Sequence, residues 1–132
     1  MGKGEPAVEA AGRPSRVLVA DDDRDVRVMI KTLLELDGHE VLEAPDGKKA
    51  WEMITRKRPQ IVIADIQMPG LNGLELCRKV KSDGFQDTRI IVFTAGMATE
   101  QDSRSAGCDG YFLKTDPLNR LRDAVREFAA SV

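Results

Sequence analysis

The feature that most constrains this fold is a regular alternation between short apolar runs and longer stretches with helical periodicity. The runs are rich in valine and isoleucine, and the strongest are apolar throughout, which is typical of strands covered on both faces. The runs are Val17–Ala20, Glu40–Ala44, Ile61–Ala64, Ile90–Thr94 and Tyr111–Leu113. Such alternation predicts a doubly wound α/β domain, with a five-stranded parallel sheet and about five helices.

The segments between the runs carry apolar residues at spacings of three and four, as amphipathic helices do. Gly38 is expected to end the first helix. Asp116 and Pro117 are expected to open the last one, with Asp116 as the cap and Pro117 in the first turn. Residues 99–106 have almost no apolar face, which predicts a short, weak or mobile helix.

Composition limits the class of protein. Residues 1–15 contain glycine and proline but little apolar material, which predicts a flexible tail or linker before a single domain at 16–132. The formal charge of −2 argues against direct nucleic-acid binding, and no apolar run is long enough to cross a membrane. We therefore expect a cytoplasmic protein with reduced thiols, and Cys77 in the core.

Hydrophilic residues follow directly on four of the apolar runs. They are Asp21, Asp22 and Asp23 after the first, Asp65 after the third, Thr94 at the end of the fourth and Lys114 after the fifth. The carboxyl ends of parallel strands share one edge of the sheet, so these side chains are expected to converge there.

That set has a coherent chemistry. Clustered carboxylates repel one another unless a counter-charge is present, and Mg²⁺ accepts hard oxygen ligands of this kind. A carboxylate can also attack a phosphoryl group, and lysine and threonine can bind the phosphoryl oxygens. An acidic cluster before a helix is nevertheless more often a capping feature, so the convergence of four strand ends carries this interpretation.

The same stretches resemble the receiver domain of two-component response regulators. The resemblance extends from Arg16 to Ser131 and rests on "VLVADDD", "IVIADIQMPGLNGLEL", "IIVFTA" and "GYFLK". It implies a flavodoxin-like sheet of order 2-1-3-4-5. It also implies that the phosphoacceptor is Asp65. It assigns no role to Asp23, which we expect at the start of the helix that follows. The implied ligands of Mg²⁺ or Mn²⁺ are Asp21 (mainly through water), Asp22, Asp65 and the backbone carbonyl of Gln67. The implied phosphoryl-binding and switch residues are Thr94, Ala95, Tyr111 and Lys114.

The resemblance further implies partners. A receiver accepts a phosphoryl group from a phosphohistidine on a histidine kinase or histidine phosphotransfer protein, and catalyses only its own phosphorylation and dephosphorylation. The modification then remodels the face of the fourth helix, fifth strand and fifth helix. That face would contact a downstream protein, a linked output domain or a second copy of the chain.

Two departures from the family pattern stand out. Lys114 is followed by Thr115 instead of proline, so a cis bond there is not expected and the loop should hold Lys114 less rigidly. The stretch from Thr94 to Lys114 is also shorter than is usual. We therefore hypothesise an unusual signalling face with a partly unwound fourth helix.

Three alternatives remain open. A pseudo-receiver would use the same fold as a docking module that needs no phosphorylation, although the set of Asp22, Asp65, Thr94 and Lys114 favours a phosphorylatable domain. A flavodoxin-like cofactor binder would need a glycine-rich loop after the first strand, where this chain has acids. A Mg²⁺-dependent phosphatase would need a second acid at position 67, which is glutamine.

Overall fold

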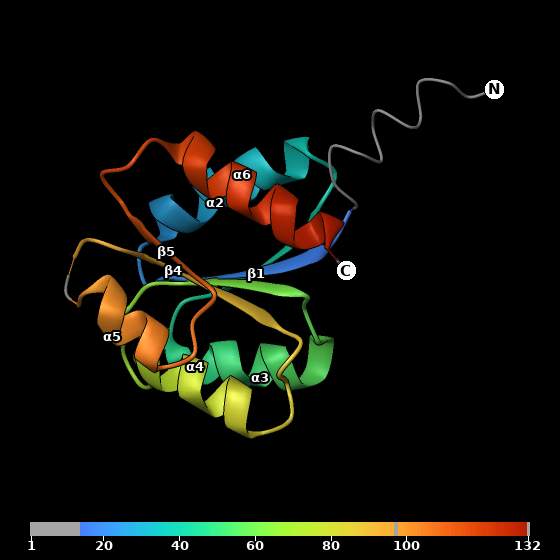
Figure 1. Cartoon of the computed structure of the whole chain (residues 1–132). Helices are drawn as coiled ribbons and strands as arrows, with labels where there is room; N and C mark the ends of the chain where they lie inside the picture. Colours follow the sequence, from blue (N-terminus) through green and yellow to red (C-terminus); the bar gives the residue numbers. More distant parts are fainter. Residues whose placement is uncertain (1–13, 97, 132) are drawn as a thin grey trace.

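A parallel sheet forms the centre of the molecule, seen in a computed structural model that describes residues 14–96 and 98–131 (Figure 1). The strands are β1 (Arg16–Ala20), β2 (Glu40–Ala44), β3 (Ile61–Ala64), β4 (Arg89–Thr94) and β5 (Gly110–Leu113). The five predicted strands are thus confirmed. Those at Glu40 and Ile61 have the expected bounds, and the other three begin one residue earlier.

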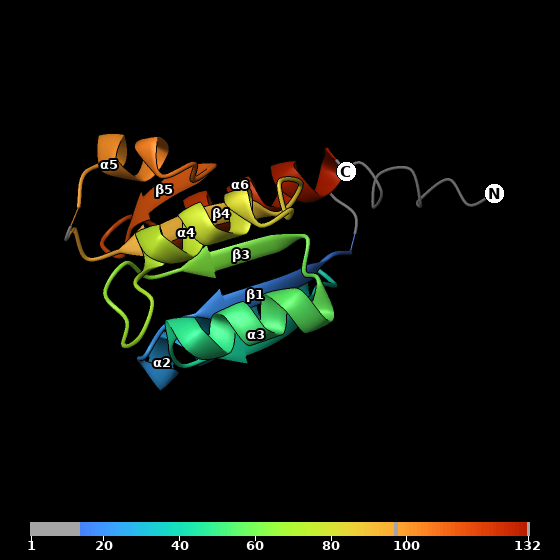
Figure 2. The ribbon, with the colours of Figure 1, turned by 90° about the horizontal axis from the view of Figure 1, so that it is seen from below.

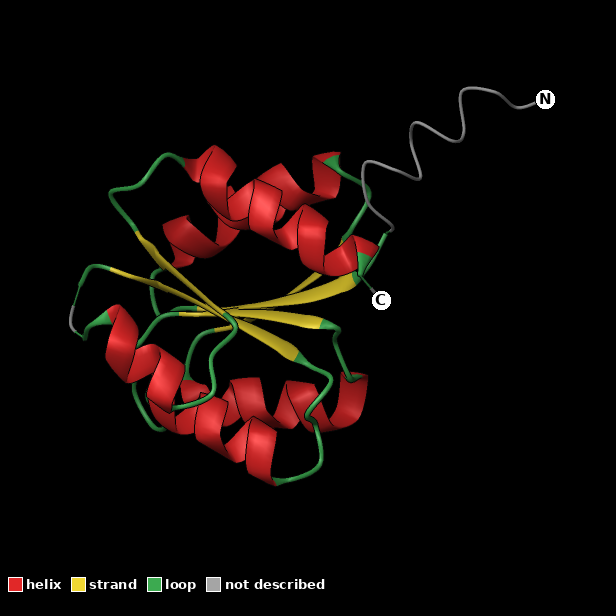
Figure 3. Cartoon of the chain, viewed as in Figure 1, coloured by secondary structure: helices red, strands yellow, loops and turns green. Residues whose placement is uncertain are grey.

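Helices connect the strands and cover both faces of the sheet (Figure 3). In the described ranges they are α2 (Arg24–Leu36), α3 (Gly47–Lys57), α4 (Gly73–Ser82), α5 (Glu100–Ser105) and α6 (Leu118–Ala130). Two apolar clusters show which helix covers which face. One joins α2 and α6 to Val17 and Val19 of β1, and the other joins α3 and α4 to Leu18 and Ala20 of the same strand. Strand β1 is therefore buried on both sides, as its unbroken apolar sequence predicts.

The strand order is β2-β1-β3-β4-β5, with every neighbouring pair parallel (Figure 2). This confirms the order that the family resemblance implied. The chain turns one way from β1 to β2 and crosses back to β3, so β1 and β3 flank the switch in strand order. Ala20 lies opposite Ala64 in their register. The residues that follow these alanines lie at the edge of the sheet where doubly wound folds bind ligands.

Local side-chain contacts decide where the helices begin and end. Asp23 caps α2 by accepting a hydrogen bond from the Asp25 amide at 2.9 Å, as expected. Gly38, with φ of 87°, follows the Asp37 cap of the same helix. That conformation is readily open to glycine.

The expected capping role of Asp116 is wrong. Its carboxylate accepts from the Leu113 amide at 2.9 Å, and its own amide donates to the Leu113 carbonyl at 2.9 Å. Helix α6 begins at Leu118 with Pro117 at the cap position and no side-chain cap. The tight turn after β5 holds Asp116, so its carboxylate is not free to cap the helix.

The boundary region of the predicted tail is partly visible. Residues 1–13 lie outside the described part of the chain, but Ser15 is buried. Its amide donates to Nδ1 of His39 at 3.0 Å, and its carbonyl accepts from the Glu40 amide at 3.0 Å. Ser15 therefore packs with the strands, one residue before the expected boundary.

No helix in the described ranges is long and apolar enough to span a membrane. All peptide bonds in those ranges are trans, including the bond after Lys114.

Helix α5 is the short helix that the sequence predicts. It has six residues, a capping box of Thr99 and Asp102, and Ser103 as its one buried residue. Helix α2 is longer and buries Ile30 and Leu34. The polar caps form α5, but few apolar contacts hold it against the sheet.

We expect the amides of Glu100–Ser105 to exchange with solvent much faster than those in the centre of α2, because local opening of α5 exposes little apolar surface. Hydrogen exchange followed by mass spectrometry measures both helices in one sample. Equal protection of α5 and α2 would show that α5 is firmly held. It would refute the hypothesis of a weakened fourth helix, since α5 is the fourth helix of the described ranges.

Candidate functional site

The backbone of the two central strands places two carboxylates side by side. Asp21 follows β1 and donates its amide to the Ala44 carbonyl at 3.1 Å, while the Asp65 amide donates to the Ala20 carbonyl at 3.0 Å. Both residues are thus continuations of the sheet ladder. Their side chains are 3% and 8% exposed, so they are held in place with little access to water.

An acidic cluster forms at this edge. Carboxylate oxygens of Asp21, Asp22 and Asp65 all lie within 4.8 Å of one another, with Asp22 exposed and the other two buried. Asp23 instead caps α2. The run of three acids after β1 therefore divides into two residues of the cluster and one residue of the helix.

Lys114 joins the buried acids. Its Nζ lies 2.8 Å from Oδ2 of Asp21 and 2.9 Å from Oδ2 of Asp65. Burial raises the pKa of Asp21, and the hydrogen bond from Lys114 only partly offsets this effect. Burial also opposes the charge of Lys114, but its hydrogen bonds to Asp21 and Asp65 raise its pKa. The ammonium is therefore charged at neutral pH and neutralises part of the cluster.

The donor set suits a hard divalent cation. Three carboxylates and one ammonium leave two negative charges at the edge of the sheet. Oxygen ligands from one or two carboxylates, completed by water, are what Mg²⁺ prefers. The exposed Asp22 leaves this site open to solvent, so a cation and its water can enter.

The loop after Asp65 depends on a glycine that sequence reasoning missed. The Gly73 amide donates to the Ile66 carbonyl at 3.0 Å, and a Cβ at Gly73 would collide with the Asp65 backbone. Asn72 and Glu75 then form a capping box that starts α4. The glycine of "LNG" was the available signal, because a residue without a side chain permits close approach of two backbones.

Gln67 lies in the same loop and is exposed. Its amide donates to Oδ1 of Asp65 at 3.3 Å. Each oxygen of the Asp65 carboxylate thus has a donor, because Oδ2 accepts from Lys114. The residue predicted to lend its backbone carbonyl to a metal therefore lies beside the acidic cluster.

The end of β4 lies in the same layer of the sheet. Thr94 is fully buried, and its Oγ1 accepts a weak hydrogen bond from the Gly96 amide at 3.4 Å. The Lys114 amide donates to the Thr94 carbonyl at 2.7 Å, so the two residues are held on adjacent strands. Ala95 is exposed and contributes only a methyl group beside the site.

Tyr111 is not part of the acidic cluster. It is half-buried on β5, and its hydroxyl donates to the Ala98 carbonyl at 2.7 Å. That bond connects β5 to the chain just before α5. The structure thus joins Lys114 directly to Asp21 and Asp65, and it holds Thr94 on the neighbouring strand. Tyr111 is hydrogen-bonded to Ala98, just before α5.

The comparisons with known proteins agree with this geometry. The family model of the response regulator receiver domain matches residues 17–126. The chain belongs to the response-regulator receiver family. Its parallel sheet of order 2-1-3-4-5 and its flanking helices are those of flavodoxin-like receiver structures.

Curated relatives of this receiver are response regulators. The chain is 39% identical to response regulator MprA of Mycolicibacterium vanbaalenii over 115 residues, 86% of this chain and 49% of the relative. It is 40% identical to MprA of Mycobacterium ulcerans over 113 residues, 84% of this chain and 48% of the relative. The receiver thus spans about half the length of the curated relatives it matches.

Solved structures give the same result. The receiver domain of the Francisella response regulator 1452 is similar with a TM-score of 0.82 and 29% identity, covering 89% of this chain and 98% of that one. The BeF3-activated receiver domain of Klebsiella pneumoniae RstA has a TM-score of 0.73 and 30% identity, covering 84% and 98%. The chain is a receiver domain of two-component systems.

Substitutions at neighbouring acids test the division of the run after β1. Asp22→Ala removes a cluster carboxylate and should weaken Mg²⁺ binding by at least about tenfold. Asp23→Ala should leave the Mg²⁺ affinity within about twofold, while lowering stability by about 1 kcal/mol through loss of the helix cap. Titration calorimetry and thermal unfolding measure the two effects. Equal loss of Mg²⁺ affinity in both variants would contradict this division.

Lys114→Gln should have the opposite effect on the metal. Repulsion between one nearby cation and a divalent ion is about 1–4 kcal/mol in a partly solvated site, so the Kd for Mg²⁺ should fall by at least about fivefold. The exposed Lys57, at the far end of the sheet, offers Lys57→Gln as a control of equal charge change. Weaker Mg²⁺ binding in Lys114→Gln would mean that this lysine organises the acids more than it competes with the cation.

Proposed function

We propose that this receiver accepts a phosphoryl group on Asp65 in a phosphorelay, with Mg²⁺ or Mn²⁺ as cofactor. The observation that supports it is the convergence of Asp21, Asp22, Asp65 and Lys114 at one sheet edge, with two ion pairs shorter than 3 Å. Two acids bound to one ammonium, with a third acid beside them, suit a site in which charge is rearranged, because the lysine can exchange one partner for another.

Transfer begins with the carboxylate of Asp65. One of its oxygens attacks the phosphorus of a phosphohistidine on a histidine kinase or phosphotransfer protein, and the P–N bond of the donor breaks as the new P–O bond forms. Asp65 is held for this step by the amide of Gln67 and by its own place in the sheet ladder. Holding the nucleophile in one position lowers the entropic part of the barrier.

Asp22, Asp65 and the Gln67 carbonyl would hold the cation, with Asp21 acting mainly through water. When bound, the cation screens the negative charge of the phosphoryl oxygens as the carboxylate approaches them. The remaining work is done by the chain. Lys114 moves from the carboxylate of Asp65 to a phosphoryl oxygen, and the Thr94 hydroxyl donates to another. Ala95 leaves room beside them.

The switch follows from the loss of the present contacts of Thr94 and Tyr111. As Thr94 turns toward the phosphoryl group, Ala98 shifts with it. The hydrogen bond from the Tyr111 hydroxyl to the Ala98 carbonyl is then weakened, and the tyrosine becomes free to turn. The phosphoryl group therefore biases two packings of the α5–β5–α6 face. This face would contact a downstream protein, a linked output domain or a second copy of the chain.

The remaining parts of the proposal concern the cellular role. The domain acts in the cytoplasm as a signalling switch, and its catalysis is limited to its own phosphorylation and dephosphorylation. Signalling passes through protein contacts and not through direct nucleic-acid binding by this domain.

The test is phosphorylation without a kinase. The protein is incubated with Mg²⁺ and acetyl phosphate and its intact mass is measured. We expect a gain in mass of one phosphoryl group, and no gain when an excess of chelator is present from the start of the incubation. Asp65→Asn should show no gain, whereas Asp87→Asn, a change at an exposed aspartate outside the site, should behave like the unaltered protein.

The same experiment separates the proposal from its alternative. No gain in mass with any small donor or with a phosphorylated phosphotransfer protein would favour a pseudo-receiver that docks without phosphorylation. A gain that persists in Asp65→Asn would place the modification on another residue.

A further inference from the structure

We propose that Cys77 and Cys108 form a reversible disulfide when a small peroxide enters the cavity beside Cys108. This modification site is separate from the acidic cluster and does not depend on phosphorylation. It joins α4 to the turn that precedes β5. The inference depends on the contacts of that turn, on its cavity and on the chemistry of two neighbouring thiols.

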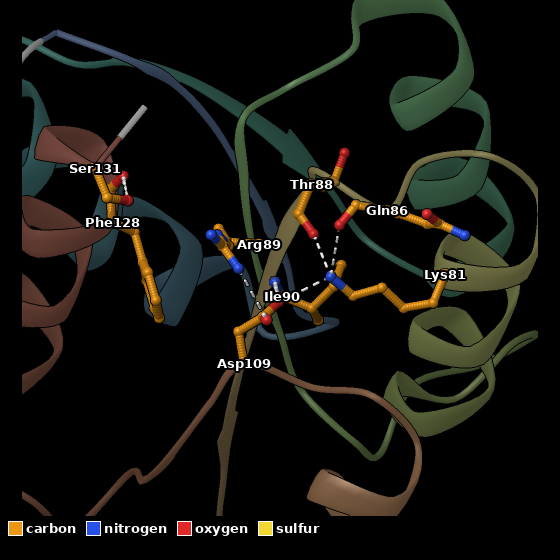
Figure 4. Close-up of polar contacts among 8 residues, drawn as sticks. All are labelled: Lys81, Gln86, Thr88, Arg89, Ile90, Asp109, Phe128 and Ser131. Atoms are coloured by element: carbon orange, nitrogen blue, oxygen red, sulfur yellow. Dashed lines mark hydrogen bonds and ion pairs between the residues drawn. The ribbon is translucent and has the colours of Figure 1, made fainter.

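The turn before β5 is held against α4 by polar contacts (Figure 4). Nζ of Lys81, which lies one helical turn after Cys77, lies 3.0 Å from Asp109 Oδ2 and also donates to the Thr88 carbonyl at 2.6 Å. Asp109 Oδ2 in turn accepts from the Ile90 amide at 2.8 Å. These contacts hold the residue next to Cys108 between α4 and the start of β4.

The opposite neighbour of Cys108 is equally close to α4. A Cβ built on Gly107 would lie 3.2 Å from Cγ of Lys81. The two residues that flank Cys108 thus both approach the helix face shared by Cys77 and Lys81. In agreement, Cys108 packs against the apolar cluster that contains the fully buried Cys77.

The two thiols interact in the reduced protein, in which both are free. A hydrogen bond from Cys108 lowers the pKa of the Cys77 thiol, although burial opposes this. The same hydrogen bond and burial raise the pKa of Cys108. Cys77 is fully buried and Cys108 is partly exposed, so solvent reaches only the Cys108 sulfur, and that sulfur is the one that Cys77 can attack.

Solvent reaches the pair from the side of Cys108. This partly exposed residue lines a cavity of about 90 Å³, together with Ser103 and Tyr111. Such a volume holds about three water molecules, so hydrogen peroxide fits and a peptide disulfide does not. The Ser103 hydroxyl is the one buried side-chain nitrogen or oxygen atom in the described ranges that lacks a hydrogen-bond partner. It can bind a small polar molecule in that space.

The reaction has two steps. The Cys108 sulfur attacks one peroxide oxygen, the O–O bond breaks, and the other oxygen leaves as water with the thiol proton, so sulfur is oxidised to sulfenic acid as the peroxide is reduced. The Cys77 sulfur then attacks the Cys108 sulfur, and the S–O bond breaks. The hydroxyl leaves as water with the Cys77 proton. The raised pKa of Cys108 makes the first step slow, so excess peroxide is needed.

The bond would have a mechanical consequence. It would cross-link α4 to Cys108, two positions before the start of β5. Strand β5 carries Tyr111. Strand β4 and helix α5 lie within the closed loop, so their motion relative to α4 would be restricted. Thr94 and Ala98, which move in the proposed function, both lie within this closed loop.

The test treats the full chain with excess hydrogen peroxide, unfolds it in the presence of iodoacetamide and measures its intact mass. We expect a monomer that has lost two hydrogen atoms, carries no alkyl group and regains two alkylatable thiols after dithiothreitol. Peptide mapping should link Cys77 to Cys108. Two free thiols after treatment, or a disulfide between two chains, would overturn the proposal.

Two variants resolve the steps. Cys77→Ala removes the second nucleophile, so Cys108 should gain oxygen and react with dimedone, a sulfenic-acid trap. Cys108→Ser, at a partly exposed position, should leave the buried Cys77 as a free thiol. Dimedone labelling of Cys77 in Cys108→Ser would overturn the assigned order.

Glutathione disulfide, too large for the cavity, should oxidise the unaltered protein at least about tenfold more slowly than hydrogen peroxide does. An equal rate would exclude entry through the cavity.

Discussion

The bridging of Asp21 and Asp65 by Lys114 is the contact on which the rest of the site depends. Parallel strands end at one edge, so a doubly wound sheet with acids after β1 and β3 must bring like charges together. The lysine after β5 reaches across the end of β4 and lies within 3 Å of both acids. It offsets part of the repulsion between the two buried acids, and it leaves a net negative charge for a cation to balance.

This contact also relates the site to the surrounding structure. Lys114 is bonded through its amide to Thr94, and the turn after it is closed by Asp116. These hydrogen bonds connect the lysine to β4, to the end of β5 and to the start of α6. The short helix α5 lies between the two strands with one buried residue. It is the shortest helix in the described ranges, so we expect it to open locally more readily than the other helices.

A second group of polar contacts, around Lys81 and Asp109, lies at the opposite end of the sheet. There Lys81 and Asp109 bind backbone atoms of Thr88 and Ile90, and Arg89 lies over the Phe128 ring at 5.8 Å. The amino end of β4 is thus fastened to α4 and α6, while its carboxyl end approaches the acidic cluster. Cys77 and Cys108 lie beside the fastened end. A cross-link between them would extend that restraint toward Tyr111.

Much of the architecture could be predicted from the sequence alone, because it depends on local periodicity. Unbroken apolar runs indicated buried parallel strands, and the acids, Thr94 and Lys114 were assigned to one edge from their positions alone. The weak apolar pattern of residues 99–106 indicated a short helix. The role expected of Asp116 was wrong, because a cap and a turn acceptor look alike in sequence and only the path of the chain after β5 selects between them.

The sequence by itself determined the strands, most helix positions and the edge at which the polar residues gather, since alternation and spacing are properties of neighbouring residues. Only the tertiary structure decided the partners. It showed that Lys114 bridges Asp21 and Asp65, that Gly73 lets α4 approach the backbone of Asp65, and that the turn at Cys108 packs on the face of α4 that carries Cys77. Except for Gly73 and Asp65, which are close in sequence, these contacts join residues that are 31 to 93 positions apart. Such pairs depend on strand order and helix packing, which no local pattern encodes.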